Sequence, residues 1–363
     1  MVKVKVCNWR CIEDLELDLA RLNVFIGGNS TGKSSLAYSV YMASKSSRVS
    51  DARSILTQLY GYDFNWIVRK VEGKPQFPIL IKIADSEFSV KLKQLPEFPE
   101  VSEKVEKREV GEKDFDITSL QKSPWTDEYL LPSRRVDYLH IVMFLPKMMR
   151  ELKAKPEAET LTRMFGGWIG GLFELFKALP ILPPFGIFAS DYTRALTGLR
   201  LESVRGEFRD AGAYILNIPL YLSVIDVITQ DPYTKLQLPV ELAPDGLTDF
   251  LIFDAVTQKI PENSLIVIEE PEVYKNPLRI MEFTEHIVKR VLNRKLTLIM
   301  TTHSDIPLTT MAKLVAEGKL KIEDIKVFYF KRDPWTKISE IKFFEDGTIE
   351  QLPDTEKLIT YLF

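Results

Sequence analysis

The chain has 363 residues, which leaves room for two domains of about 100–200 residues each. Hydrophobic residues make up 45% of it and aromatic residues 11%, so a wholly disordered chain is excluded. Lysine and arginine number 48 against 51 acidic residues, for a net charge of −3. Global charge therefore gives no drive toward nucleic acid or an acidic membrane, and any such surface must be a local patch.

Cysteine usage and the N-terminus favour a cytoplasmic protein. Cys7 and Cys11 are the two cysteines; they could form a disulfide or half a metal site, but buried thiols in a reducing compartment are the favoured interpretation. The N-terminus lacks the apolar core of a signal peptide. The most apolar stretch, 164–189, carries Glu174, Lys177 and three prolines, so we expect no membrane span.

Three short strands are predicted at the start of the chain. Apolar and charged residues alternate in 2–6 and again in 15–19, which is the period of a strand with one buried face. The continuous apolar run from Val24 to Ile26 then predicts a fully buried strand.

Residues 27–34, GGNSTGKS, follow this strand and fit the G-x-x-x-x-G-K-[ST] pattern of a phosphate-binding loop. Gly27 and Gly32 allow the backbone to turn its N–H groups toward a phosphate, and a helix beginning at Lys33 adds the positive end of its dipole. Lys33 can reach the β and γ phosphates of ATP, and the Ser34 hydroxyl can hold Mg²⁺. The predicted nucleotide-binding residues are Gly27, Gly28, Asn29, Ser30, Thr31, Gly32, Lys33, Ser34 and Ser35.

The middle of the chain is expected to hold an antiparallel sheet and then helices. Residues 78–92 predict a hairpin with its turn at Asp85–Ser86, and 96–113 predict an exposed loop. A buried strand and a turn are expected in 129–135. We interpret 137–229 as helical, with basic clusters in 147–155 and 194–209 that could touch phosphates, although solvated helix faces are the favoured interpretation.

A second buried strand ends in two carboxylates. Residues 264–272 read SLIVIEEPE, the pattern of a Walker B strand. Glu269 would hold the Mg²⁺ shell and Glu270 would polarise the attacking water. Adjacent strand residues point to opposite faces, so the two acids can do different jobs. An acidic turn without function is the alternative, and the presence of a phosphate-binding loop disfavours it.

A further strand, 296–301, is followed by His303. A histidine at this strand end can sense a γ-phosphate and orient the water. A lone histidine is more often structural, and we interpret His286 as structural or exposed. His303 lies one strand after the acidic pair, and we favour a functional role for it. Asn276 and Ser304 or Asp305 are expected to cap the two helices that follow these strands. Two or three strands are predicted in the tail that begins at Lys326, with a turn at Asp346–Gly347.

These motifs resemble the OLD and RecF-like ABC-class ATPases, which are related to SMC proteins, over most of the chain. The resemblance rests on the opening VCNWRCIEDLELDL, the phosphate-binding loop, YLLPSRR at 129–135, the EEPE segment and His303. It implies an α/β P-loop NTPase fold of ABC-ATPase type, with a mixed central sheet, an antiparallel β subdomain and an inserted helical lobe. We expect the nucleotide-binding core in 1–135 and 236–363 and the helical lobe in 136–235.

The resemblance also implies roles for particular residues. Lys33, Glu270 and His303 would be catalytic, and Ser34 and Glu269 would hold the metal. Gly246 lies in the slot of the signature loop, which caps the γ-phosphate of the opposite protomer in the family. Pro244 stands where the family has a serine, which removes a hydroxyl and a backbone N–H. No set of acids typical of the TOPRIM nuclease domain of OLD proteins follows.

The function implied is an ATP- and Mg²⁺-dependent ATP hydrolase. Two copies would form a homodimer around two ATP molecules and couple closure to DNA or to a separately encoded effector protein, in DNA repair or defence. An ATP-gated binding subunit with little turnover is the alternative, because of Pro244. A transporter subunit is a third possibility, which the absence of a Leu-Ser-Gly-Gly-Gln signature disfavours.

Overall fold

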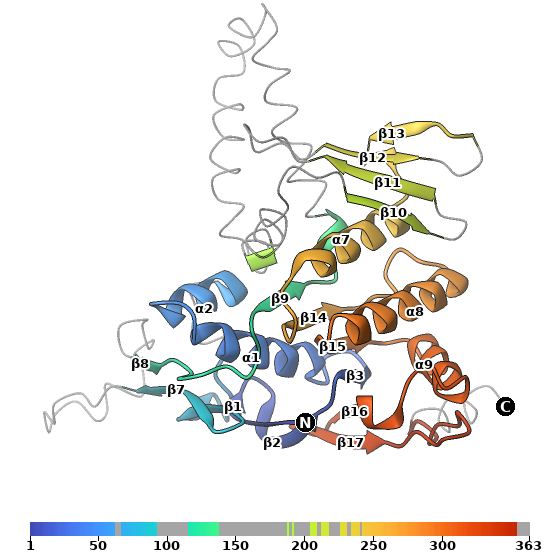
Figure 1. Ribbon diagram of the computed structural model, residues 1–363. Coiled ribbons are helices and arrows are strands. Elements are labelled where there is room, and N and C mark those ends of the chain that lie inside the picture. Colours follow the sequence, from blue (N-terminus) through green and yellow to red (C-terminus); the bar gives the residue numbers. More distant parts are fainter. Residues whose placement is uncertain are drawn as a thin grey trace, which may run out of the picture.

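The computed structural model describes residues 1–61, 67–92, 115–137, 187–188, 191, 204–208, 212–217, 226–230, 234–239 and 242–353. Its centre is a six-stranded sheet in the order β17-β16-β3-β15-β14-β9 (Figure 1). In that order the strands are Thr336–Ile341, Ile325–Arg332, Leu22–Gly27, Thr297–Thr302, Leu265–Glu269 and Glu128–Leu131. All neighbours are parallel except β17, which runs antiparallel to β16. The mixed central sheet expected from the sequence is confirmed.

A second sheet is antiparallel throughout, in the order β2-β1-β6-β7-β8. Its strands in that order are Ile12–Leu19, Val2–Trp9, Ile79–Ile83, Ser86–Leu92 and Phe115–Thr118. The predicted hairpin is present, but its turn lies one residue earlier, at Ala84–Asp85, where Ala84 takes a left-handed φ of 51°. Two short strands, β4 (Lys70–Val71) and β5 (Lys74–Pro75), form a separate hairpin.

The helix after the phosphate-binding loop lies between the two sheets, which also meet directly where β2 contacts β17, and further helices cover the far face of the central sheet (Figure 1). Within β3, Phe25 packs with α1 (Lys33–Ser46), α2 (Ala52–Tyr60) and the antiparallel sheet. Its neighbours Val24 and Ile26 point the other way, as strand geometry requires. They join the core built with α7 (Asp245–Lys259), α8 (Pro277–Asn293) and α9 (Ile306–Ala316). In the described residues, no helix combines the length and apolar character that crossing a bilayer requires.

The expectation of a helical lobe in 136–235 is wrong for the described residues of 204–230, which form strands. Four antiparallel strands are present there or just beyond: β10 (Val204–Phe208), β11 (Gly212–Asn217), β12 (Asp226–Gln230) and β13 (Gln237–Pro239). Apolar runs this short fit the helical and the strand period equally well. Figure 1 shows this sheet beside α7. The loop at 96–113, the basic cluster at 147–155 and most of the cluster at 194–209 lie outside the described residues.

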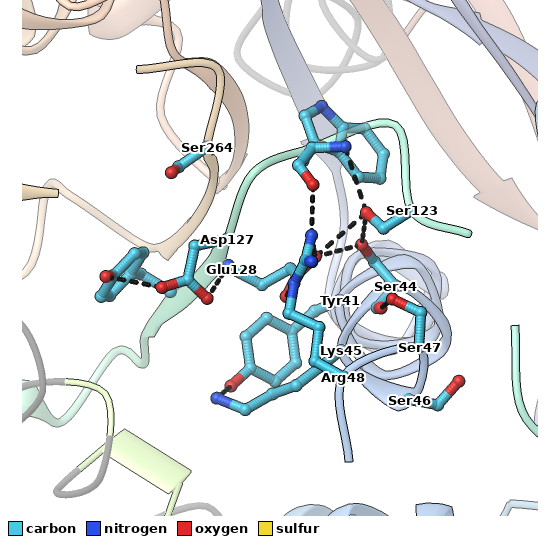
Figure 2. Close-up of polar contacts among 12 residues, drawn as sticks. Tyr41, Ser44, Lys45, Ser46, Ser47, Arg48, Ser123, Asp127, Glu128 and Ser264 are labelled. Carbon is cyan, nitrogen blue, oxygen red and sulfur yellow. Dashed lines mark hydrogen bonds and ion pairs between the residues drawn. The ribbon is translucent and has the colours of Figure 1, made fainter. Parts of the chain in front are cut away.

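A buried polar network fixes the second half of α1 against β9. The Glu128 side chain, which is fully buried, accepts hydrogen bonds from the Ser44 hydroxyl at 2.5 Å and the Arg48 guanidinium at 3.1 Å. Figure 2 shows these groups converging, with Ser123 on the same carboxylate. Asp191 adds a second anchor, because it accepts from the Tyr41 hydroxyl at 2.6 Å and from a backbone N–H of β9 at 3.0 Å. The helix that begins at the phosphate-binding loop is thereby anchored to β9 over its second half.

Candidate nucleotide-binding site

The phosphate-binding loop connects the end of β3 to the start of α1 at Lys33, as predicted. Gly27 and Gly32 take φ values of 147° and 106°, which L side chains rarely adopt. A Cβ on Gly27 would lie 2.3 Å from a backbone oxygen of β16, and one on Gly32 would lie 2.4 Å from the Thr336 hydroxyl. That hydroxyl donates to the Thr31 carbonyl at 2.8 Å. The loop therefore packs closely against β16 at Gly27 and against β17 at Gly32, and both positions tolerate only glycine.

Lys33 lies across this loop. Its ammonium donates to the carbonyl oxygens of Gly27 at 2.9 Å and Gly28 at 2.7 Å. Burial lowers the pKa of Lys33 from 10.5 to about 8, against the opposing effect of the nearby carboxylates, Glu270 first among them. A buried cation with only neutral acceptors within hydrogen-bond distance gains strongly from a phosphate placed in the same loop.

Glu269 ends β14 and lies under the start of α1. Its carboxylate accepts a hydrogen bond from the Tyr38 hydroxyl at 2.5 Å and another from the Ser34 hydroxyl. Burial raises the pKa of Glu269, and these two hydrogen bonds oppose the shift. Hydroxyl and carboxylate oxygens are the ligands that Mg²⁺ prefers. Ser34 and Glu269 are therefore adjacent and of the right chemistry for Mg²⁺ beside bound phosphates.

Glu270 follows in an uncommon backbone conformation, with a φ of 45°. Its N–H donates to the Thr301 carbonyl at 2.8 Å, and its carboxylate lies 3.3 Å from Nε2 of His303. The other ring nitrogen, Nδ1, lies 3.1 Å from the carbonyl oxygen of Gly27. The same nitrogen lies 3.5 Å from the Lys33 ammonium, so whether it donates to the carbonyl or accepts from the lysine is set by the tautomer of the ring. The imidazole thus bridges the Glu270 carboxylate and the phosphate-binding loop.

Glu272 fixes the backbone that carries His303. One of its carboxylate oxygens accepts from the Thr302 hydroxyl at 2.8 Å and from the backbone N–H of His303 at 2.7 Å. The sequence analysis assigned no role to this residue. Its place two positions beyond Glu270 in the EEPE segment is the signal that was available.

The residues around the loop enclose a cleft of about 790 Å³, within the ~300–1,000 Å³ typical of small-molecule pockets. Glu270 and His303 line it together with the loop from Asn29 to Ser35. Six further lining residues were not predicted as part of the site: Arg10, Cys11, Val68, Lys70, Arg332 and Trp335. Cys7 and Cys11 are free thiols, so a disulfide between them is excluded. Cys11 is buried, and Cys7 is only half-buried.

Gly246 lies outside this cleft. It sits in the first turn of α7, where an added Cβ would come within 3.1 Å of the Tyr274 carbonyl oxygen. Pro244 is the N-cap residue of the helix and offers only its carbonyl, which accepts from the N–H groups of Leu247 at 2.9 Å and Thr248 at 3.0 Å. The structure thus brings the loop, Glu269, Glu270 and His303 together and leaves Gly246 apart.

Comparisons with known proteins agree with this site over the first part of the chain. Residues 1–94 match the AAA ATPase domain family. No curated protein matches the chain. The family match and the loop geometry support an ATP-binding domain of the P-loop ATPase class.

Among solved structures, the chain is similar to SMC head domains at low identity. One is the Smc head domain with an extended coiled coil bound to the C-terminal domain of ScpA, from Pyrococcus furiosus, with 10% identity, a TM-score of 0.49 and coverage of 100% of this chain and 99% of that one. The SMC head domain from Thermotoga maritima has 9% identity and a TM-score of 0.42, over 94% and 98% of the two chains. A SmcHead bound to the C-winged helix domain of ScpA has 9% identity and a TM-score of 0.48, over 98% of each chain.

Proposed function

We propose that the protein is an ATP hydrolase of the ABC class, in the OLD and RecF-like branch, that works as a homodimer. The observation that carries this proposal is the convergence of Lys33, Glu270 and His303 in one cleft, at the carboxyl ends of β3, β14 and β15. Ligands of open α/β sheets bind at this edge. The three side chains supply a cation for phosphate, a carboxylate for water and a hydrogen-bonding ring between them.

Each residue has a distinct part in the proposed reaction. The backbone N–H groups of 27–35 bind the phosphates, and Lys33 exchanges its carbonyl partners for the β and γ phosphate oxygens. Glu270 accepts a proton from the water that attacks the γ-phosphate. His303 holds the Glu270 carboxylate in place and donates toward the γ-phosphate. Ser34 and Glu269 would hold Mg²⁺, which would supply positive charge that neutralises the phosphates.

Dimerisation gives Gly246 its proposed role. The start of α7 lies away from the nucleotide cleft of its own subunit, and Pro244 and Asp245 are exposed there. In the proposed dimer this turn closes on the ATP of the partner subunit, and closure is coupled to DNA or to an effector protein. Pro244 also favours a second candidate, an ATP-gated binding subunit with little turnover, because the N-cap provides neither a hydroxyl nor an N–H to a phosphate.

Steady-state phosphate release tests the proposal. The wild type is compared with Glu270→Gln and with Glu285→Gln, which removes an exposed carboxylate on α8, in the presence and absence of linear double-stranded DNA. Loss of a general base typically costs about 10²- to 10⁴-fold, so Glu270→Gln should fall by that factor while Glu285→Gln is unchanged. Tight ATP binding with equal, near-zero release by wild type and Glu270→Gln would favour the gated-binding candidate.

Light scattering tests the dimer separately. Glu270→Gln should bind ATP and Mg²⁺ without turning them over and should double its mass when both are added. A monomeric mass under these conditions would contradict the proposed sandwich. A rise in wild-type turnover with DNA would identify DNA as the coupled partner, and indifference to DNA would point to a protein.

A further inference from the structure

We propose that Arg135 is a positioning residue for the catalytic carboxylate and that Asp249 couples it to the start of α7. This inference rests on the proposed hydrolysis at Glu270. Arg135, Asp249 and Lys275 form a buried cluster, which we call the α7 clamp. Its members come from three distant segments: the helical residues 135–137 that follow β9, the helix α7 and the loop after β14.

The α7 clamp is closed to solvent. The Arg135 side chain is 1% exposed, and those of Asp249 and Lys275 are fully buried. Arg135 contacts both carboxylate oxygens of Asp249, one of them at 2.7 Å, and Lys275 bonds to the same carboxylate. Burial alone would raise the pKa of Asp249, but the two cations hold it below its usual range. Two cations against one carboxylate are costly to bury, so the cluster is not explained by stability alone.

One contact of the α7 clamp reaches the catalytic residue. Arg135 Nη1 donates to the Glu269 carbonyl oxygen at 2.6 Å. That carbonyl belongs to the same peptide group as the N–H of Glu270, which donates to the Thr301 carbonyl at 2.8 Å. The peptide entering Glu270 is therefore held at both of its polar ends. This restraint fixes the peptide plane that precedes Glu270, where φ is a left-handed 45°, and so contributes to the direction of its side chain.

The other side of the α7 clamp reaches the signature slot. Asp249 lies one helical turn after Asp245, the first residue of α7. Lys275 also donates to the Val273 carbonyl at 3.1 Å, and the carbonyl of the next residue, Tyr274, faces Gly246. A displacement of the start of α7 therefore moves Asp249, and Arg135 transmits the movement to the Glu269–Glu270 peptide. In the proposed dimer, each carboxylate would respond to the nucleotide held by the partner subunit.

The same helix offers a matched control. Near its far end, Asp254 pairs with Arg290 and lies 3.1 Å from His286, both on α8. His286 is thus partly buried and in contact with α7, which supports the structural one of its two interpretations. The Arg290 pair has the same chemistry as the Arg135 pair and also joins α7 to a neighbour, but it has no contact with the Glu269–Glu270 peptide among the described residues. Replacing Arg290 therefore perturbs α7 without perturbing Glu270.

The experiment compares wild type, Arg135→Lys and Arg290→Lys for two quantities, the Kd for ATP and the kcat of phosphate release. Lysine keeps the charge but lacks the planar guanidinium that bonds to the Asp249 carboxylate and the Glu269 carbonyl at the same time. We expect Arg135→Lys to lose about 10- to 100-fold in kcat, the cost of a small misplacement of a catalytic group. We expect its Kd for ATP to change by less than about threefold, because no phosphate contact is removed. Arg290→Lys should retain both quantities.

A second variant covers the case in which Arg135→Lys does not fold. Asp249→Asn keeps the shape of the side chain and should show the same selective loss of kcat. Unchanged kcat in the folded variants, or equal losses of kcat and affinity in the Arg135 and Arg290 variants, would overturn the positioning role. A wild type that binds ATP but releases no phosphate would instead refute the proposed hydrolysis, and this role with it.

Discussion

Replacing Lys33 with methionine should stabilise the nucleotide-free protein and abolish its response to ATP. The ammonium is buried against the carbonyls of Gly27 and Gly28, and its pKa falls from 10.5 to about 8. At about 1.4 kcal/mol per pH unit, that difference corresponds to roughly 3 kcal/mol against the charged form at neutral pH. Because solvent screens part of it in an open cleft, we expect a gain of about 1–2 kcal/mol.

Thermal unfolding measures this gain. For a chain of 363 residues the expected shift is about 2 °C in Tm. ATP with Mg²⁺ should raise the Tm of the wild type, since a ligand that binds only the folded state stabilises it, and should leave Lys33→Met unchanged. Lys289→Met, which replaces an exposed lysine on α8, is the control and should match the wild type.

The pH dependence has a defined sign. Between pH 8 and 10.5 the unfolded chain keeps the proton of Lys33 while the folded chain has released it. The wild type therefore gains stability as the pH rises through this window, and the advantage of Lys33→Met should disappear there. A lower Tm of Lys33→Met without nucleotide, or an undiminished response of this variant to ATP, would refute the reasoning.

Three further outcomes are expected. Gly27→Ala should lower the Tm and abolish ATP binding, because its Cβ would lie 2.3 Å from a backbone oxygen of β16, whereas Gly28→Ala, with its nearest neighbour at 3.8 Å, should keep the wild-type Tm. Glu128→Ala should cost about 1–3 kcal/mol of unfolding free energy in chemical denaturation, since it removes a buried carboxylate that accepts from the Ser44 and Ser123 hydroxyls and leaves both without that partner; a loss under about 1 kcal/mol would mean that the network of Figure 2 contributes no more than a surface ion pair. In the pH profile of the phosphate-release rate, Tyr38→Phe should move the acidic limb to higher pH, because it removes a hydrogen bond that favours ionised Glu269. An unshifted acidic limb would mean that ionisation of Glu269 does not limit turnover.

The parts of the site that sequence predicted are those with local patterns. The loop at 27–34, the carboxylates that end β14 and the histidine that follows β15 each sit directly after a buried apolar run, and parallel strands bring such ends together. The strand order itself was not predictable, because β9 and β16 join the sheet through pairings across long stretches of chain.

The residues that sequence analysis missed depend on contacts between distant segments. Arg135 and Asp249 are 114 positions apart, and nothing in either neighbourhood indicates that they pair. Trp335 and Lys70 reach the cleft only because two separate hairpins end beside it. The helical expectation for 204–230 failed for a local reason: runs of five or six residues are too short to separate the two periods.

The position of β3 in the central sheet has a consequence for how the molecule is made. Both of its neighbours, β15 and β16, come from the last fifth of the chain, beginning at Thr297 and Ile325. During synthesis the nucleotide loop therefore emerges long before the strands that flank it, and the segment 1–94 that matches the ATPase family cannot complete its own sheet. Such late, long-range pairing slows folding. We expect ATP binding to appear only once the ribosome has released the residues of β16.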